Sequence, residues 1–233
     1  MLTSVIALDK DLLMWFNGGH SLFLDCLVPL LTSGWIWIPL YVGLFYLIVK
    51  NNETMAQILL IVGSVACCLL LSGGLDDMLV KPLVGRLRPC NEPTIASQLS
   101  LVPGTLFSDF SFFSAHSANT MAVALFFCLL VRDRLLGIAL ICWSLLNAWT
   151  RLYLGVHFPS DILAGLFEGA IASFLVYLVY RKAYFKISPR LNYISTQYTA
   201  TGYNRVDIDV VIGLLVLTVA VAVILAVGNV FTT

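Results

Sequence analysis

Charged residues are scarce in this sequence, and their scarcity excludes two large classes of protein. Only 11% of the 233 residues are charged and 60% are hydrophobic, with a mean hydropathy of +0.94. Soluble domains have roughly 45–50% apolar and about 25% charged residues. The chain is therefore neither a soluble globular protein nor a disordered one. Thirteen basic residues balance thirteen acidic ones, so no excess of positive charge favours nucleic acid as a partner.

The sequence also lacks the patterns that hold disulfide frameworks or metal ions. Four of the six cysteines lie inside apolar runs, where cysteine behaves as a small hydrophobe: Cys67, Cys68, Cys128 and Cys142. No spacing of Cys, His and Asp is typical of a zinc site, and no set of carboxylates is typical of a pair of magnesium ions. We therefore expect neither a metal nor another cofactor.

What the sequence has instead is six long apolar runs. A helix that crosses a bilayer needs about 20 predominantly apolar residues. Read from charge to charge, the runs are 26–49, 54–80, 110–131, 135–150, 162–180 and 210–233. The sequence therefore predicts an all-α fold, a polytopic membrane helix bundle with six transmembrane helices.

The first 24 residues differ from these runs. Asp9, Lys10 and Asp11 interrupt an apolar stretch, as is typical of an amphipathic helix in the membrane interface. The Asn-Gly-Gly sequence at 17–19 then ends the helix. The predicted organisation has four parts: an N-terminal interfacial amphipathic segment 1–24, a helical bundle 25–182 that carries the site, a cytoplasmic loop 183–209 and a C-terminal transmembrane helix 210–233.

The distribution of Lys and Arg over the connections predicts which side of the bundle faces the cytoplasm. The connections after the first, third and fifth spans hold eight of these residues, and the opposite side holds five. The positive-inside rule places the richer side in the cytoplasm and both termini outside. Three polar clusters then fall together on the outer side.

The first two clusters flank the long connection before the third span. At the end of the second span, Lys81, Arg86 and Arg88 place three cations on the outward side. Taken alone they fit a snorkelling basic collar, but their position runs against the positive-inside rule and calls for a counter-anion. Asp77, four residues before Lys81, shares its helix face and is the expected counterion. His116 follows small residues at the start of the third span, where free backbone N–H groups favour an anion. A satisfied interface histidine is the alternative there.

The third cluster joins the fourth and fifth spans. Pro159 suits the first turn of a helix, which places His157 at an exposed helix start and Asp161 in the first turn. A carboxylate that binds one ring nitrogen leaves the other as a nucleophile or general base, the alternative being an interfacial His–Asp cap. Two histidines among several cations are what phosphoryl transfer requires.

The three clusters resemble the motifs of the type 2 phosphatidic acid phosphatase superfamily, in its short bacterial type. Its integral-membrane lipid phosphatases carry the motifs K-x6-RP, PSGH and SR-x5-H-x3-D. The first and third motifs match at these positions: Lys81, Arg88, Pro89, Arg151, His157 and Asp161. The second reads Phe113-Ser114-Ala115-His116, which keeps Ser and His but lacks the Pro and Gly, and Thr150 replaces the Ser before Arg151.

The resemblance implies a role for each matching residue. His157 is the nucleophile that forms a phosphohistidine, Asp161 orients it, and His116 is the general acid and later the base for water. The remaining motif residues bind the phosphate oxygens: Lys81, Arg88, Arg151 and Ser114.

Two charged residues lie outside the family pattern. Arg86 is interpreted as a contact to the membrane surface, the alternative being a second phosphate or a headgroup. Glu168 shares a helix face with Asp161 and lies roughly 10 Å deeper in the membrane. A buried hydrogen bond to a neighbouring helix is the favoured interpretation of Glu168, and a wall of the substrate cavity is the alternative.

The sequence therefore predicts a metal-independent lipid phosphatase in a bacterial inner membrane, with its site facing the periplasm. Its partners are the bilayer and a phosphorylated lipid, with undecaprenyl diphosphate or a lipid A phosphate preferred. A lipid phosphotransferase remains an alternative. A transporter is disfavoured because only Glu168 lies deep in a span, and a non-catalytic lipid-binding protein because every titrating group of the motifs is present. The oligomeric state is left open.

Overall fold

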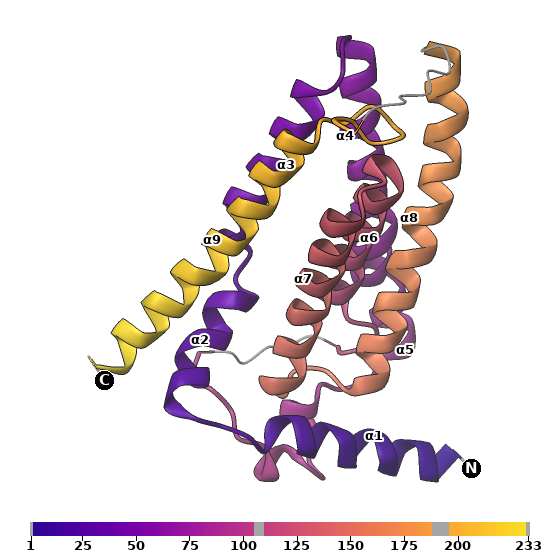
Figure 1. The fold of residues 1–233 in the computed structure, drawn as a ribbon. Helices are drawn as coiled ribbons and strands as arrows, with labels where there is room; N and C mark the ends of the chain where they lie inside the picture. The colour runs from indigo at the N-terminus through magenta and orange to yellow at the C-terminus, as the bar shows by residue number, and fades with distance from the viewer. Residues whose placement is uncertain (1, 105–109, 188–195, 232–233) are drawn as a thin grey trace.

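The computed structural model describes residues 2–104, 110–187 and 196–231, and every regular element within these ranges is helical. The long helices stand side by side, and the first helix lies across one end of them (Figure 1). The helices are α1 (Leu2–Asn17), α2 (Leu22–Thr32), α3 (Ile38–Lys50), α4 (Met55–Leu69), α5 (Lys81–Val84), α6 (Ala115–Val131), α7 (Arg134–Tyr153), α8 (Pro159–Ile187) and α9 (Arg205–Val230). Short 3-10 turns lie at Gly34–Trp37, Pro89–Asn91 and Ala96–Gln98.

The structure agrees with the expected bundle of membrane-spanning helices, but the number of such helices differs from the predicted six. Within the described ranges, four helical stretches are long and apolar enough to cross a membrane: Met55–Gln98, Arg134–Tyr153, Pro159–Ile187 and Arg205–Val230. The bent pair Leu22–Thr32 and Gly34–Lys50 makes a fifth if it is counted as one span. At the position of the expected third span, α6 is apolar but has only 17 residues.

The first expected span is broken, so the prediction of one helix over 26–49 is wrong. The two halves, α2 and Gly34–Lys50, meet at an angle of 65°. Pro29 inside α2 has no N–H group to donate to the preceding turn, and the chain leaves the helix at Ser33. The indole of Trp37 donates to the carbonyl oxygen of Leu31 at 2.8 Å, which satisfies one of the groups freed by the break.

The second span is continuous but wound more widely near the end that leads into α5. Two π-helical turns, Leu70–Gly74 and Asp76–Val80, connect α4 to α5. The side-chain oxygen of Asn119 in α6 accepts from the Gly73 N–H at 2.9 Å and from the Ser72 hydroxyl at 2.6 Å. Because this amide intercepts a backbone donor of the span, the helix takes up a wider turn there.

The centre of the bundle is α6, which packs against α4, α7 and α8. Gly165 and Gly169 of α8 face α6 so closely that a Cβ atom at either would collide with the backbone at Ser114 or Ala118. Small residues four apart allow two membrane helices to approach in this way. This contact holds the starts of α6 and α8 side by side, and both starts carry motif residues.

The C-terminal helix α9 packs along α2 and α3 and begins earlier than expected. The predicted loop 183–209 is shorter in the structure, because α8 continues to Ile187 and α9 begins at Arg205; residues 188–195 of that loop lie outside the described residues. Asn204 caps α9 by accepting from the Val206 N–H at 3.0 Å. The predicted N-terminal segment 1–24 is also slightly shorter in the structure, because α2 begins at Leu22.

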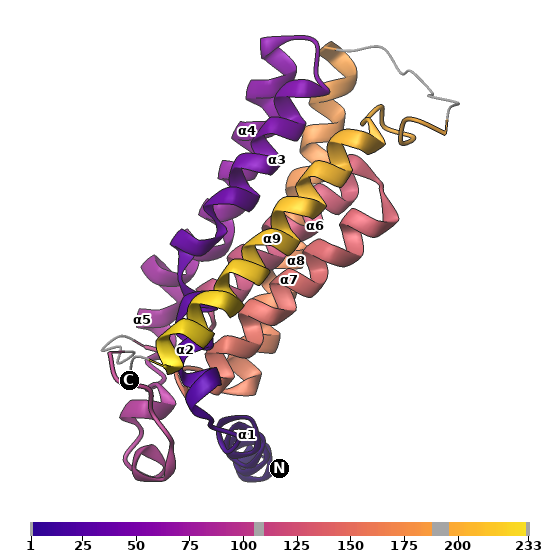
Figure 2. The ribbon, with the colours of Figure 1, turned by 60° about the vertical axis from the view of Figure 1, so that its left-hand side comes forward.

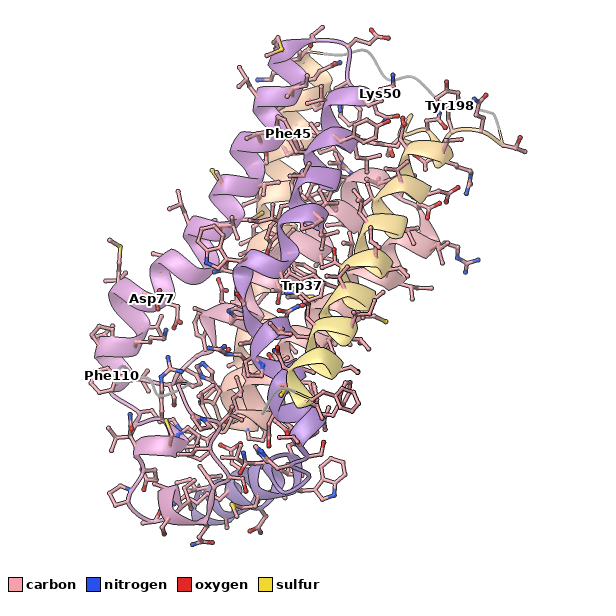
Figure 3. All side chains as sticks on the ribbon, turned by 90° about the vertical axis from the view of Figure 1, so that its left-hand side faces the viewer. Trp37, Phe45, Lys50, Asp77, Phe110 and Tyr198 are labelled. Atoms are coloured by element: carbon pink, nitrogen blue, oxygen red, sulfur yellow. The ribbon has the colours of Figure 1, made fainter. Side chains whose placement is uncertain are left out.

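The two ends of the bundle differ in what they carry. Figure 2 shows α1 at one end, opposite the end at which α3 turns into α4. In Figure 3, Lys50 and Tyr198 lie together at the α3–α4 end, whereas Asp77 and Phe110 lie toward the α1 end. The three polar clusters are all found at the α1 end.

Candidate active site

The three clusters of motif residues are joined to one another by hydrogen bonds. Arg88 donates from Nη1 to Nε2 of His157 at 3.3 Å, which links the first motif to the third. The Ser114 N–H donates to the carbonyl oxygen of Asp161 at 3.1 Å, which links the second to the third. Segments far apart in the chain thus converge on a single site.

His157 lies in the turn between α7 and α8 and is 2% exposed, so the expectation of an exposed histidine is wrong. Its Nδ1 lies 2.9 Å from the carbonyl oxygen of Ser111, which can only accept a proton, while its Nε2 faces the donor Arg88. These two partners fix the tautomer: Nδ1 carries the hydrogen and Nε2 keeps its lone pair. Burial lowers the pKa of His157 to about 4, and the cations Arg151 and Arg88 act in the same direction.

Asp161 has a different set of partners from the one expected. Its Oδ2 lies 3.8 Å from Nδ1 of His157, which is too far for a hydrogen bond. The carboxylate instead accepts from the Phe158 N–H at 2.9 Å and from Nη1 of Arg86 at 2.6 Å. In this structure the acceptor that orients His157 is therefore the carbonyl of Ser111, and Asp161 acts on the imidazole through the field of its charge.

Lys81 is buried between two carboxylates at the end of the second span. Its ammonium group donates to the predicted counterion Asp77 and lies 3.3 Å from Oδ2 of Asp76. Asp76 is fully buried and also accepts from the Phe113 N–H at 3.1 Å. Asp76 therefore connects the lysine of the first motif to the segment that carries the second.

Arg151 is positioned by the break in the first span. Its Nη1 donates to the hydroxyl oxygen of Thr32, the last residue of α2, at 2.6 Å. Thr150 also donates toward Thr32 at 3.1 Å and lies 2.6 Å from the carbonyl of Asn147. Thr32 stands immediately before the bend, so the residue at which α2 ends contributes a hydrogen-bond partner to Arg151.

Ser114 and His116 form the first turn of α6. Ser114 is the N-cap of the helix, and its hydroxyl oxygen accepts from the N–H and the hydroxyl of Ser117 at 3.4 and 3.1 Å. His116 is the second residue of the helix and borders a cavity of about 450 Å³. The polar lining of the cavity includes His116, Asn119, Thr120 and Asn147.

The walls of this cavity are apolar and come from α3, α4, α6 and α7. They include Trp37, Phe45, Leu69 and Val123; Trp37, in the 3-10 turn before α3, and Phe45 of α3 are labelled in Figure 3. Phe45 is 53% exposed and Leu69 is 39% exposed on the outer surface of the bundle. The cavity thus has two exposed residues and His116 in its lining.

The two residues outside the family pattern do not behave as their favoured interpretations predict. Arg86 does not extend to the membrane surface: it is half-buried and donates to Asp161 and, from Nη2, to Asp9 of α1 at 2.6 Å. The buried Oε2 of Glu168 has no hydrogen-bond partner within the described part of the chain, so the expected helix-to-helix hydrogen bond is not formed by this oxygen.

Sequence reasoning missed four residues that hold the site together: Asp9, Thr32, Asp76 and Ser111. Thr32 and Ser111 carry no local signal, because their partners lie far away in the chain. Asp76 stands next to the predicted counterion and is itself a charge inside an apolar run, which is a usable signal. Among the residues that the structure describes, no group of three His, Cys, Asp or Glu side chains is arranged to hold a metal ion.

Comparison with known proteins agrees with the family that the motifs resemble. The sequence model of the family described as "PAP2 superfamily" matches residues 56–185. A lipid A 4'-phosphatase of Bacteroides thetaiotaomicron is 36% identical over 75% of this chain and 78% of its own length. A lipid A 4'-phosphatase of Porphyromonas gingivalis is 30% identical over 76% and 74%, respectively. The crystal structure of LpxE from Aquifex aeolicus has the same fold, with a TM-score of 0.57, 22% identity, and coverage of 72% of this chain and 94% of that one.

Proposed function

Because the chain belongs to the PAP2 superfamily of lipid phosphatases, we propose that it removes a phosphate group from lipid A through a phosphohistidine intermediate. The observation that carries this proposal is the state of His157: a buried, neutral imidazole whose Nε2 lone pair points toward Arg88. A cationic group beside the nucleophile is where the charge of a phosphoryl group is stabilised.

The proposed reaction has two steps that use the same residues. In the first, Nε2 of His157 attacks the phosphorus, the bond from phosphorus to the lipid oxygen breaks, and His116 donates a proton to that oxygen. In the second, His116 takes a proton from water, the water oxygen attacks the phosphohistidine, and inorganic phosphate leaves. The phosphoryl oxygens are held by Lys81, Arg88 and Arg151, with Ser114 at the start of α6.

The cavity below His116 supports a lipid substrate rather than a soluble one. Most of its lining side chains are apolar, His116 is among the few polar ones, and the lining residues Phe45 and Leu69 are exposed. We assign it to an acyl chain of the substrate, because an acyl chain in this position would keep the phosphate beside His157 and its oxygen beside His116. Relatives that act on lipid A make the phosphomonoester of that lipid the first choice, and undecaprenyl diphosphate is the second.

The proposal includes a topology. Counting the bent pair as one span and α6 as another gives six spans, with α1 in the outer interface and the site facing the periplasm across a bacterial inner membrane. The cations Lys50, Arg132, Arg134 and Lys182 gather at the ends of helices on the opposite side from α1, as the positive-inside rule requires of the cytoplasmic face.

The test is phosphate release by the purified protein in detergent, with lipid A bisphosphate and undecaprenyl diphosphate as separate substrates and EDTA in excess. We expect turnover of lipid A, unaffected by EDTA, and its loss in the His157→Ala variant. Turnover of undecaprenyl diphosphate alone would overturn the choice of lipid, activity only with added Mg²⁺ would overturn the mechanism, and full activity of His157→Ala would overturn the assigned nucleophile.

A further inference from the structure

Helix α1 sends a buried carboxylate into the site. Asp9 is 7% exposed, although the helix that carries it lies across the end of the bundle. Its Oδ1 accepts from the Ser160 N–H at 2.8 Å, and its Oδ2 accepts from the Ser160 hydroxyl and from Nη2 of Arg86, both at 2.6 Å. A charge is buried in this way only where it has partners, and every partner of Asp9 lies beside the catalytic turn.

Arg86 connects Asp9 to the carboxylate that follows His157. Its Nη2 binds Asp9, and its Nη1 binds Oδ1 of Asp161 at 2.6 Å and the Ser160 hydroxyl at 2.7 Å. The face of the guanidinium lies 3.9 Å from the centre of the Phe158 ring. A planar group with partners at both edges and on its face has a single orientation, so the position of Asp9 determines that of Arg86.

The geometry points to Asp9 as a positioning residue for the nucleophile, acting through Arg86 and Asp161. Asp161 accepts from the N–H of Phe158, the residue that follows His157, so the Asp9–Arg86–Asp161 chain fixes the turn that presents Nε2. This inference rests on the proposed role of His157. It gives α1 a part in the chemistry in addition to its contact with the membrane, where Leu8, Leu12 and Trp15 are exposed.

The attachment of α1 does not depend on Asp9 alone, which makes the residue testable. At the end of α1, Asn17 donates to the carbonyl oxygens of Tyr153 at 2.7 Å and Ser100 at 3.0 Å, and accepts from the Ser100 N–H at 2.8 Å. Leu13, one turn after Asp9, is fully buried. Replacing Asp9 with Asn removes a charge and leaves these contacts in place.

The experiment compares Asp9→Asn with Asp11→Asn, which makes the same change at an exposed position of the same helix. We expect kcat for the lipid phosphate to fall about tenfold to a hundredfold in Asp9→Asn, with KM changed less than twofold. Asp11→Asn is expected to behave as the wild type, and both variants to keep the wild-type melting temperature within a few degrees.

A double-mutant cycle separates positioning from a general structural effect. If Asp9 acts through Arg86, then Asp9→Asn in an Arg86→Gln background is no slower than Arg86→Gln alone. Equal kcat in Asp9→Asn and Asp11→Asn, or losses that multiply in the double variant, would overturn the inference. These outcomes require an active wild type that His157→Ala inactivates, so they differ from a failure of the proposed function.

Discussion

At the scale of single residues, the buried imidazole of His157 determines how activity depends on pH. Its pKa is lowered to about 4, chiefly by burial, so the imidazole is mostly neutral above that value. An unperturbed histidine has a pKa near 6.5. The unfolded chain therefore takes up a proton below about pH 6.5 that the folded protein refuses, and this histidine destabilises the fold as the pH falls from 6.5 toward 4.

The prediction is that His157 does not titrate between pH 5 and 8. Histidine ring resonances in NMR spectra of the detergent-solubilised protein report the titration directly, with the His157→Ala spectrum as the assignment. In Arg88→Gln, which removes a nearby cation, we expect the midpoint to move upward. A midpoint near 6.5 in the wild type would contradict the burial and the neutral state described for this residue.

At the scale of residues, the sequence predicts which motif side chains cluster better than it predicts the groups that hold them in place. The spacing from Lys81 to Arg88 and from Arg151 to Asp161 is local, and a helix start or a turn converts it directly into a cluster. The partner of His157 is a backbone carbonyl, that of Ser111, and a backbone group leaves no trace in the residue types. For the same reason the sequence predicts Asp161 as the acceptor that orients His157, whereas the structure shows the carbonyl of Ser111 in that position.

At the scale of elements, Thr32, the last residue before the bend in the first span, is a hydrogen-bond partner of Arg151. Replacing Thr32 with Val keeps the shape of the side chain but removes the oxygen that lies 2.6 Å from Nη1 of Arg151. We expect vanadate, which mimics the transition state of phosphoryl transfer, to inhibit this variant about tenfold more weakly, or about 1.4 kcal/mol. The matched control is Thr218→Val in α9, whose hydroxyl donates to the carbonyl of Leu214 in the same helix at 2.7 Å; equal inhibition of both variants would show that Thr32 is dispensable.

The cavity between α3, α4, α6 and α7 predicts a separation between substrates. Ala66 of α4 lines the cavity, and a Trp at this position would occupy it. We expect Ala66→Trp to lose activity toward the long-chain lipid while keeping its activity toward p-nitrophenyl phosphate. Cys67→Trp, on the adjacent exposed position that does not line the cavity, is the control. Equal losses on both substrates would place the acyl chain elsewhere.

The sequence predicts the elements well where hydrophobicity decides them and poorly where a remote side chain does. The fourth and fifth apolar runs lie within α7 and α8, the second is helical from Met55 to Val80, and the sixth, in the described part of the chain, is helical from Val210 to Val230. The π-helical turns depend on the amide of Asn119 reaching Gly73, and the start of α9 depends on the Asn204 cap. Pro29 does give a local signal for the bend, but a proline in an apolar run is also tolerated in unbroken membrane helices.

At the scale of the whole molecule, the distribution of charge predicts which end faces the cytoplasm. Ser97 lies between Thr94 and Ser100, which bind Lys10 and Asn17 of α1, and Glu53 lies between α3 and α4; both are exposed. Single cysteines at these positions, with Cys26 and Cys90 replaced, can be tested with a membrane-impermeant maleimide. We expect the cysteine at position 97 to react in spheroplasts and the one at position 53 only after permeabilisation. The reverse pattern would place the site on the cytoplasmic leaflet.

The exposed residues of the cavity lining have a consequence for kinetics. Phe45 and Leu69 line the cavity and are exposed, so under the proposed function the substrate approaches by diffusing within the leaflet rather than through water. The rate then depends on the surface concentration of substrate, which is the amount of substrate per unit area of the leaflet. Adding inert detergent at a fixed amount of lipid should slow turnover by surface dilution, while hydrolysis of water-soluble p-nitrophenyl phosphate should be unchanged. In a cell, the same enzyme would work faster on a leaflet enriched in its substrate without any change in the total amount of that lipid.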